Sequence, residues 1–211
     1  MTLTIQQAHH IIEEIKQRDA SIGRDMSRWW MYETHIQTAA NIAKTIASHI
    51  QGIDPDQAYV CALLHDVCRT NERLQSRFHG ISGYEKLINI DEHAARAALL
   101  HMFVYNEIPP FEECASMFFN KQEDYDFTFD YIKNTKVTDE DLLIQLADNL
   151  SNKDGFVTIE ARAQDLANRR GLVLAPQWFE KRYALKNYFD KKVNSNIYEY
   201  FINKPKQQRQ Y

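Results

Sequence analysis

The chain has 211 residues, 44% of them hydrophobic, and a net charge of −4 at pH 7, which is sufficient for one domain with a core of its own. The slightly acidic balance, without a basic stripe, argues against a nucleic-acid polymer as partner. The sequence shows neither a signal-peptide pattern nor an apolar run long enough to cross a membrane. Three cysteines without framework spacing indicate reduced thiols. We therefore expect a cytoplasmic protein whose basic tail, residues 204–211, is a solvated end.

The first third of the chain predicts three helices, because apolar residues recur at spacings of three and four. A helix capped by Thr2 or Thr4 runs to about residue 18, and a second spans about residues 26–50. The run DPDQ at residues 54–57 supplies an N-cap, a proline at the first helical position and a glutamine at the reciprocal capping position. It predicts a third helix with residues 65–66 at its carboxyl end.

The rest of the chain shows the same helical periodicity, so the predicted fold class is all-α. Local start signals mark several of these helices. Residues 82–85 resemble a capping box, and Asp91 and Thr138 are residues of the type that caps a helix. The expected helices begin at about residue 82, span about residues 91–103 and 138–152, and are followed by two more at about 157–170 and 176–202.

Residues 106–135 are the least regular part of the chain. They are rich in aromatic and acidic side chains, and we expect them to form an insertion over the functional site. The sequence contains no internal repeat and no low-complexity linker, so we expect a single domain over residues 1–211. Its motif-bearing core covers about residues 25–170, with the C-terminal helices at about 176–202.

Several side chains of metal-ligand type lie on apolar helix faces. His65 and Asp66 are adjacent in sequence and can bind one ion together. His35 lies on the apolar stripe of its helix, His101 follows three alanines at helical spacing, and Asp148 lies within the apolar run LLIQLADNL. An ionised carboxylate in such a setting is costly unless it is paired or coordinated. Three inward imidazoles and this carboxylate suit a buried cation.

Each of these residues also has an ordinary structural interpretation. A single inward histidine is more often a hydrogen-bonded core residue than a ligand, and Asp148 alone can be the partner in an ion pair between helices. The joint pattern, spread over four helices in the right order, favours the metal site. His79 and His101 can supply a second ion.

The remaining histidines and the three cysteines are poorer candidates for ligands. We expect the thiols to be structural, because Cys68 has no second thiol nearby with which to form a zinc–thiolate site. His93 lies well off the helix face of His101. The histidines expected to be solvated, because they lie at helix ends or on mixed faces, are His9, His10 and His49. The thiols expected to be structural are Cys61, Cys68 and Cys114.

The order His35, His65-Asp66 and Asp148 resembles the HD superfamily of metal-dependent phosphohydrolases, and the resemblance covers about residues 25–170. The segment HDVCR, which begins at His65, is similar to that superfamily's HD-x-G-K segment, with arginine in place of lysine and cysteine in place of glycine. Further segments resemble motifs of the subgroup that includes diadenosine tetraphosphate hydrolases. These are FHGISGYEKL at residues 78–87, AALLHMF at 97–103 and LIQLADNLS at 143–151.

The resemblance implies an orthogonal α-helical bundle of the HD-domain type and a site with six ligands. In that pattern Asp66 bridges two ions. The implied ligands are His35, His65, Asp66, His79, His101 and Asp148. Mixed histidine and carboxylate ligation does not select sharply among Fe, Mn, Mg and Zn, so we expect one or two divalent ions of this group as the cofactor.

The implied activity is hydrolysis of a phosphomonoester or a nucleotide phosphate by metal-activated water. The expected catalytic residues are Asp66, as a ligand, and Arg69, as a phosphate clamp. An arginine can hold a phosphate bidentately, but it cannot shuttle a proton because its guanidinium stays charged. Lys153 and Arg162 are weaker candidates for phosphate contacts, and we expect Arg162 to be an ordinary surface charge.

Two other functions are compatible with the same ligand set. Inositol oxygenase-like proteins resemble the six-ligand pattern and use a mixed-valence di-iron pair to activate oxygen. A regulatory module, in which the metal only organises the fold, is the other alternative, because HDVCR departs from the usual segment. We expect a small phosphorylated substrate, such as a nucleotide, as the partner, with no membrane and no nucleic-acid polymer, and the sequence allows a homodimer.

Overall fold

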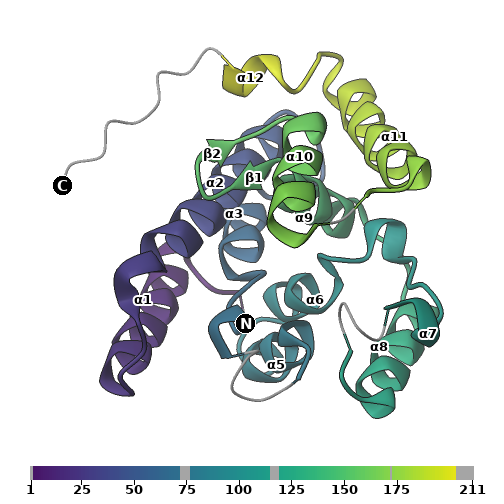
Figure 1. Ribbon diagram of the computed structural model, residues 1–211. Coiled ribbons are helices and arrows are strands. Elements are labelled where there is room, and N and C mark those ends of the chain that lie inside the picture. The colour runs from purple at the N-terminus through teal and green to yellow at the C-terminus, as the bar shows by residue number, and fades with distance from the viewer. Residues whose placement is uncertain (1, 72–76, 115–118, 172, 203–211) are drawn as a thin grey trace.

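The computed structural model describes residues 2–71, 77–114, 119–171 and 173–202. The basic tail at 204–211 lies outside these described residues. Within them the regular secondary structure is almost entirely helical, which confirms the predicted all-α class (Figure 1). The α-helices are α1 (Ile5–Ser21), α2 (Trp29–Ala47), α3 (Pro55–Leu64), α5 (His79–Leu87), α6 (Glu92–Leu100), α7 (Phe111–Cys114), α8 (Gln122–Asn134), α9 (Asp139–Asn149), α10 (Ile159–Arg170), α11 (Pro176–Val193) and α12 (Glu199–Ile202).

Short elements complete the described chain. Two strands, β1 (Ser151–Asn152) and β2 (Gly155–Phe156), pair antiparallel as a small hairpin directly after α9. Three 3₁₀ turns, η1 (Met26–Arg28), η2 (Arg69–Asn71) and η3 (Val104–Asn106), connect longer helices.

Helix starts follow the local signals in the sequence. Thr4 and Thr138 cap α1 and α9 through reciprocal capping boxes, and the Asp91 side chain accepts a hydrogen bond from a backbone amide at the start of α6. Asp54 caps α3 in the same way. Gln57 does not reciprocate, because its side-chain amide donates to Asp91 at 3.2 Å. Contacts within one turn of the chain therefore set these helix starts, and tertiary contacts are added at Gln57 and at Asp91, which also accepts from the backbone amide of Leu3 at 2.8 Å.

Several expected boundaries differ from the observed ones; the helix expected at residues 138–152, for example, ends at Asn149 and is followed by β1. The helix expected at residues 26–50 is divided into η1 and α2, and α2 ends at Ala47. The capping box expected at residues 82–85 is wrong, because α5 begins at His79 and continues through these positions. The last expected helix is interrupted at Asn194, which has a left-handed φ of 51° and ends α11. Asparagine tolerates this conformation better than most residues.

The main core forms where α1, α2, α3, α6 and α9 meet (Figure 1). Helix α3 is at its centre, and every residue from Gln57 to Leu64 is buried. The alanines of α2 and α6 allow close approach of neighbouring helices, because Ala39, Ala43 and Ala98 have no exposed surface. Helix α3 is consequently enclosed by α1, α2, α6 and α9.

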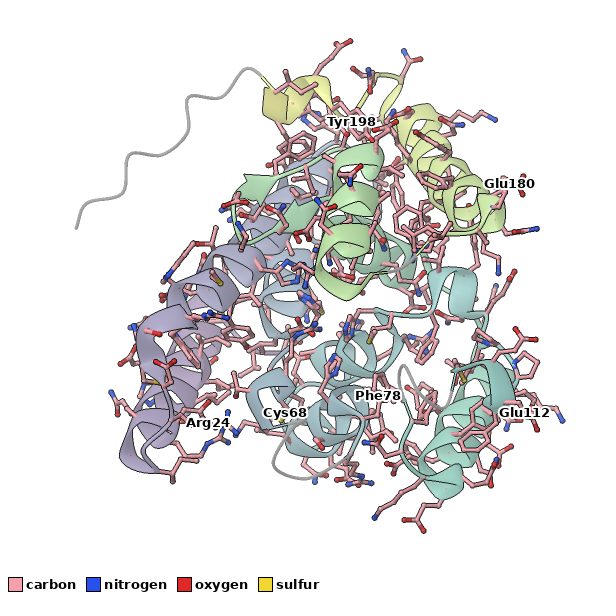
Figure 2. The ribbon with its side chains drawn as sticks, viewed as in Figure 1. Arg24, Cys68, Phe78, Glu112, Glu180 and Tyr198 are labelled. Atoms are coloured by element: carbon pink, nitrogen blue, oxygen red, sulfur yellow. The ribbon has the colours of Figure 1, made fainter. Side chains whose placement is uncertain are left out.

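A second core lies beside the first, between the α5–α6 pair and the segment that contains α7 and α8, at the lower right of Figure 1. Phe78 occupies this boundary (Figure 2). Its ring centroid is 5.1 Å from that of Phe119 and 5.0 Å from that of His79. The aromatic segment at 106–135 therefore reaches the histidines of the candidate site through Phe78.

Two further observations bear on the sequence-based expectations. All three cysteines are free and buried. None of the helices in the described ranges has the length and apolar character needed to span a bilayer.

Candidate metal centre

Asp66 joins two groups of potential metal ligands. Its Oδ1 atom lies 3.0 Å from His79 Nε2 and 3.3 Å from His101 Nε2. Its Oδ2 atom lies 3.6 Å from His35 Nε2 and 3.7 Å from His65 Nε2. Each carboxylate oxygen thus faces a different pair of imidazoles, which is the arrangement that a carboxylate bridging two ions requires.

Asp148 closes the group that contains His35 and His65. Its Oδ1 atom lies 3.2 Å from His35 Nε2 and 3.7 Å from His65 Nε2. Nitrogen and oxygen ligands bound about 2.0–2.2 Å from a common ion lie roughly 3–3.5 Å apart. The spacing of these atoms therefore fits a cation, and all six residues proposed as ligands are brought together.

Backbone contacts orient the imidazoles toward this centre. His65 directly follows the last residue of α3, and its Nδ1 lies 2.6 Å from the carbonyl oxygen of Ala62. His101 follows α6 in the same way, with Nδ1 2.9 Å from the carbonyl oxygen of Ala98. A carbonyl oxygen only accepts, so both rings carry their proton on Nδ1 and present Nε2 to the site.

Ser151 performs a similar role for His35 and was missed by the sequence reasoning. Its hydroxyl donates to the backbone carbonyl of Asp148 at 3.1 Å and lies 3.0 Å from His35 Nδ1. With its proton engaged, this hydroxyl accepts from the Nδ1–H of His35, which leaves Nε2 of that ring for an ion. The residue ends the LIQLADNLS segment, but only the contact across 116 positions reveals its role.

Two glycines explain how α5 brings His79 so close to α6. A Cβ atom on Gly80 would lie 2.5 Å from the ring of Phe78 and 2.9 Å from the carbonyl oxygen of Ala98. A Cβ atom on Gly83 would lie 2.9 Å from the Cβ of Ala98. Only residues without a side chain allow this approach, which places the Nε2 atoms of His79 and His101 3.3 Å apart.

The protonation of the centre suits a cation. Burial lowers the pKa of His35 and of His101, which favours the neutral imidazoles that bind metals. Burial opposes the charge on Asp66, but Arg69 and the imidazoles outweigh it and hold the pKa of this carboxyl well below its usual value. The Oδ2 atom of Asp66 is buried and accepts no hydrogen bond from any described residue. Its charged neighbour is the Arg69 guanidinium at 3.3 Å, and an ion at the centre would compensate this buried oxygen further.

Arginines surround the two carboxylates. Arg69 Nη1 lies 3.3 and 3.4 Å from the oxygens of Asp66, where a phosphate clamp was expected. The expectation that Arg162 is a surface charge is wrong, because its side chain is only 13% exposed and Nη2 lies 3.5 Å from Asp148 Oδ1. Lys153 instead pairs with the neighbouring Asp154 at 2.7 Å. Arg162 is buried because α10 places it beside Asp148 at the end of α9, and no local pattern in the sequence indicates that contact.

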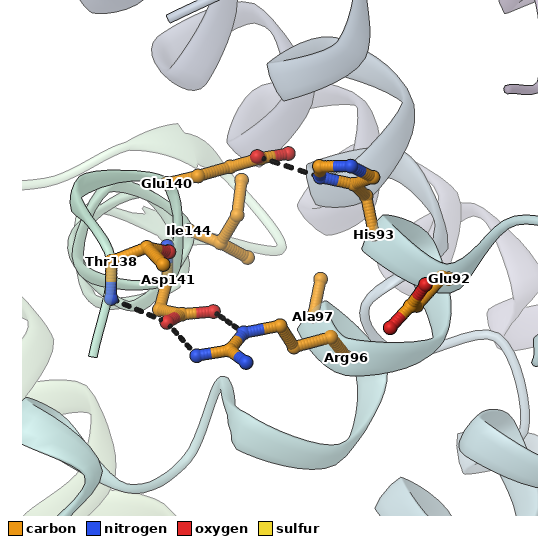
Figure 3. A pocket seen from close by; sticks show the side chains of 8 residues that line it. All are labelled: Glu92, His93, Arg96, Ala97, Thr138, Glu140, Asp141 and Ile144. Carbon is orange, nitrogen blue, oxygen red and sulfur yellow. Dashed lines mark hydrogen bonds and ion pairs between the residues drawn. The ribbon is translucent and has the colours of Figure 1, made fainter. Parts of the chain in front are cut away.

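The other histidines do not join the centre. His10 and His49 are exposed, as expected, but His9 is half-buried and lies within hydrogen-bond distance of the Tyr59 hydroxyl at 3.1 Å. His93 lines a cleft of about 260 Å³ between the amino-terminal parts of α6 and α9 (Figure 3). It precedes His101 by eight residues, about 12 Å along a helix.

Charged groups in this cleft pair with one another. His93 lies 2.9 Å from Glu140, and Arg96 lies 2.5 Å from Asp141 (Figure 3). These pairs connect α6 to α9 at the amino-terminal ends of both helices, whereas His101 and Asp148 lie at their carboxyl ends. The cleft is therefore separate from the candidate metal centre.

Comparison with protein families agrees with this geometry. The family model described as the HD domain matches residues 32–153, which is more than half of the 211 residues and includes all six candidate ligands. Comparisons with curated proteins and with solved structures gave no significant match. The resemblance found in the motifs, the all-α fold and the family match agree, and the chain belongs to the HD domain superfamily.

Proposed function

We propose that the protein is a metal-dependent phosphohydrolase that acts on a phosphomonoester or a nucleotide phosphate. The observation that carries the proposal is the position of Asp66, with one oxygen facing each pair of imidazoles. The proposed ligands are His35, His65, Asp66, His79, His101 and Asp148. One or two divalent ions of iron, manganese, magnesium or zinc fit this donor set.

A bound divalent ion lowers the pKa of a water molecule and neutralises phosphoryl oxygens. The protein's own groups do the rest. Arg69 is 36% exposed and lies beside Asp66, so its guanidinium can turn from this carboxylate to two phosphoryl oxygens of an entering substrate. It stays charged throughout and acts in binding and charge stabilisation, without transferring a proton.

The imidazoles have a fixed role in this proposal. His65 and His101 use Nδ1 to hold backbone carbonyls, so each ring is kept in one orientation and one tautomer. The walls around them are buried and apolar, since Ala62, Leu64 and Ala98 have no exposed surface. This setting strengthens the attraction between the site and an anionic substrate, because little water screens it.

The test is a screen of nucleotides and phosphate esters after chelation and add-back of each metal. On any substrate that is turned over, Asp66→Ala should abolish activity and metal binding. Arg69→Ala should keep the metal and lower kcat/KM by roughly 10- to 100-fold, as expected for one charge-assisted contact. Arg28→Ala, at an exposed position, is the matched control and should act as wild type.

Two results would overturn the proposal. Chelated protein that hydrolyses the substrate as fast as the metal-loaded form contradicts a metal-dependent mechanism. Failure to turn over any phosphate ester with any metal contradicts the activity itself. Iron content together with oxygen uptake would then favour the oxygenase alternative, and stoichiometric metal without turnover would favour the regulatory module.

A further inference from the structure

Two arginines from the C-terminal helices reach the Asp148 side of the metal centre. Arg162, on α10, places Nη2 3.5 Å from Asp148 Oδ1, and its buried Nε has no hydrogen-bond partner among the described residues. Arg182, on α11, donates from Nε to the Asn149 side chain at 2.6 Å. It also stacks on Trp178, with 3.9 Å between the guanidinium carbon and the ring centroid. Arg182 is therefore held in place before any ligand binds, and Arg162 keeps a donor that is available to one.

Positive charge exceeds negative charge on this side of the site. Asp148 also faces two imidazoles, and Asp165, 3.8 Å from Arg162 Nη1, is paired at 2.8 Å with Arg169. Burial, together with the nearby charge of Arg162 and only partly offset by Asp148, lowers the pKa of Arg182 to about 10. Buried guanidiniums that repel one another are costly unless an anion joins them, and a bound divalent ion adds to the excess.

The position of this pair differs from that of Arg69. Arg69 contacts Asp66, whereas Arg162 and Arg182 lie beside Asp148 and Asn149. The two cationic regions thus approach the centre from different carboxylates. Residues 162 and 182 also lie beyond the matched family region, which ends at residue 153, so this chain supplies them through helices of its own.

We propose that Arg162 and Arg182 bind a second phosphoryl group of the substrate, next to the one that reacts at the metal centre. This inference rests on the proposed phosphohydrolase function and narrows its substrate to compounds with two or more adjacent phosphoryl groups. A planar guanidinium suits phosphate recognition, because its terminal Nη groups can donate two parallel hydrogen bonds. Arg162 and Arg182 are then specificity-determining residues.

The experiment compares the binding of methylenediphosphonate and methylphosphonate to manganese-loaded protein by titration calorimetry, with protein-free titrations to correct for chelation. Wild type should bind the diphosphonate at least tenfold more tightly. Arg182→Gln and Arg162→Gln should each reduce this preference at least fivefold and leave methylphosphonate affinity unchanged. Lys181→Gln, at an exposed neighbouring position on α11, is the control and should keep the full preference.

Several outcomes overturn the inference. Equal loss for both phosphonates would place the arginines on the reacting phosphoryl group, and no loss for either would make them purely structural. If neither variant folds, wild type alone decides, since the absence of a preference contradicts a second phosphate position. The binding measurement does not depend on turnover, so the two proposals can be tested separately. A preference for the diphosphonate without hydrolysis of any ester would contradict the proposed function only. Hydrolysis without this preference would contradict the present inference only.

Discussion

Asp66 is the residue on which both halves of the candidate centre depend, while each histidine serves one half. His101 lies beside Oδ1 at 3.3 Å and has no such contact with Asp148. Its ring is also part of the packing between α5 and α6. Removal of one such imidazole should therefore disturb one ion position and leave the other intact.

We predict that His101→Ala lowers the metal-to-protein ratio from two to about one while the fold survives. The reason is that His35, His65, Asp66 and Asp148 retain their positions. Elemental analysis after dialysis measures the ratio, and circular dichroism checks the fold. His49→Ala, at an exposed histidine, is the control. An unchanged ratio in both His101→Ala and His79→Ala would point to a single-metal enzyme.

Metal affinity should depend on pH through the imidazoles. Burial opposes the charge on His65, but Asp66 and Asp148 outweigh it and raise the pKa of this ring. The proton bound below that pKa competes with the ion, so affinity should fall as pH falls from 8 to 5. The expected slope is about tenfold per pH unit for each proton displaced.

Calorimetric titrations of the metal at three pH values, in buffers with different protonation enthalpies, measure this effect and count the protons released. The sign is set by the ligand chemistry, since a protonated imidazole has no lone pair for a metal. Affinity that is constant over the range would contradict histidine ligation.

At the scale of elements, several candidate ligands lie at the carboxyl ends of helices, whereas His79 begins α5. His65 and His101 directly follow α3 and α6, and Asp148 lies one residue before the end of α9. The last carbonyls of a helix carry partial negative charge, which favours a cation nearby. Three helix ends therefore add to the carboxylates in stabilising a bound ion.

Helices α5 and α6 approach each other closely beside the site. We predict that Gly83→Ala destabilises the protein by about 1–3 kcal/mol, because the added Cβ would lie 2.9 Å from Ala98 and 3.3 Å from Val67. In an exposed helix the same change would stabilise by about 1 kcal/mol. The clash outweighs this gain, since both neighbours are buried.

Urea unfolding measures this difference, with Lys86→Ala on the exposed face of α5 as the control. The metal content of Gly83→Ala should also fall, because α5 carries His79 at its first turn. A variant as stable as wild type, or more so, would show that α5 shifts freely and that the glycine is not needed for packing.

At the scale of the whole molecule, the centre joins helices that are far apart in sequence, from His35 on α2 to Asp148 on α9. An ion that binds only the folded chain stabilises it by mass action. At an ion concentration 100 times the dissociation constant the gain is about 2.7 kcal/mol. For a protein of this size, that corresponds to a rise in Tm of about 5–10 °C.

We therefore predict that chelation lowers the Tm and that added manganese or zinc restores it, as followed by scanning calorimetry. Asp66→Asn is the control, because an amide that replaces the bridging carboxylate removes the ligand while preserving the size of the side chain. A rise in Tm of equal size in Asp66→Asn would mean that the ion acts elsewhere on the protein.

Much of the candidate site could be predicted from the periodicity of apolar residues in the sequence. Periodicity placed His35, His65, His101 and Asp148 on inward faces, since apolar neighbours at three and four positions define such a face. The arginines beside Asp148 could not be found in this way. Nothing around Arg162 in the sequence distinguishes it from a solvated charge, and its burial depends on how α10 packs.

The sequence by itself determined the all-α class, the helix starts at Asp54, Asp91 and Thr138, and the inward placement of His35, His65, His101 and Asp148, because capping and periodicity act within a few residues of the chain. The choice of Thr4 over Thr2 as the first cap came from the structure. Only the tertiary structure decided which oxygen of Asp66 faces which pair of imidazoles and which arginines surround the centre. These features depend on the distance and angle between packed helices, and such geometry arises from the mutual fit of side chains across the core.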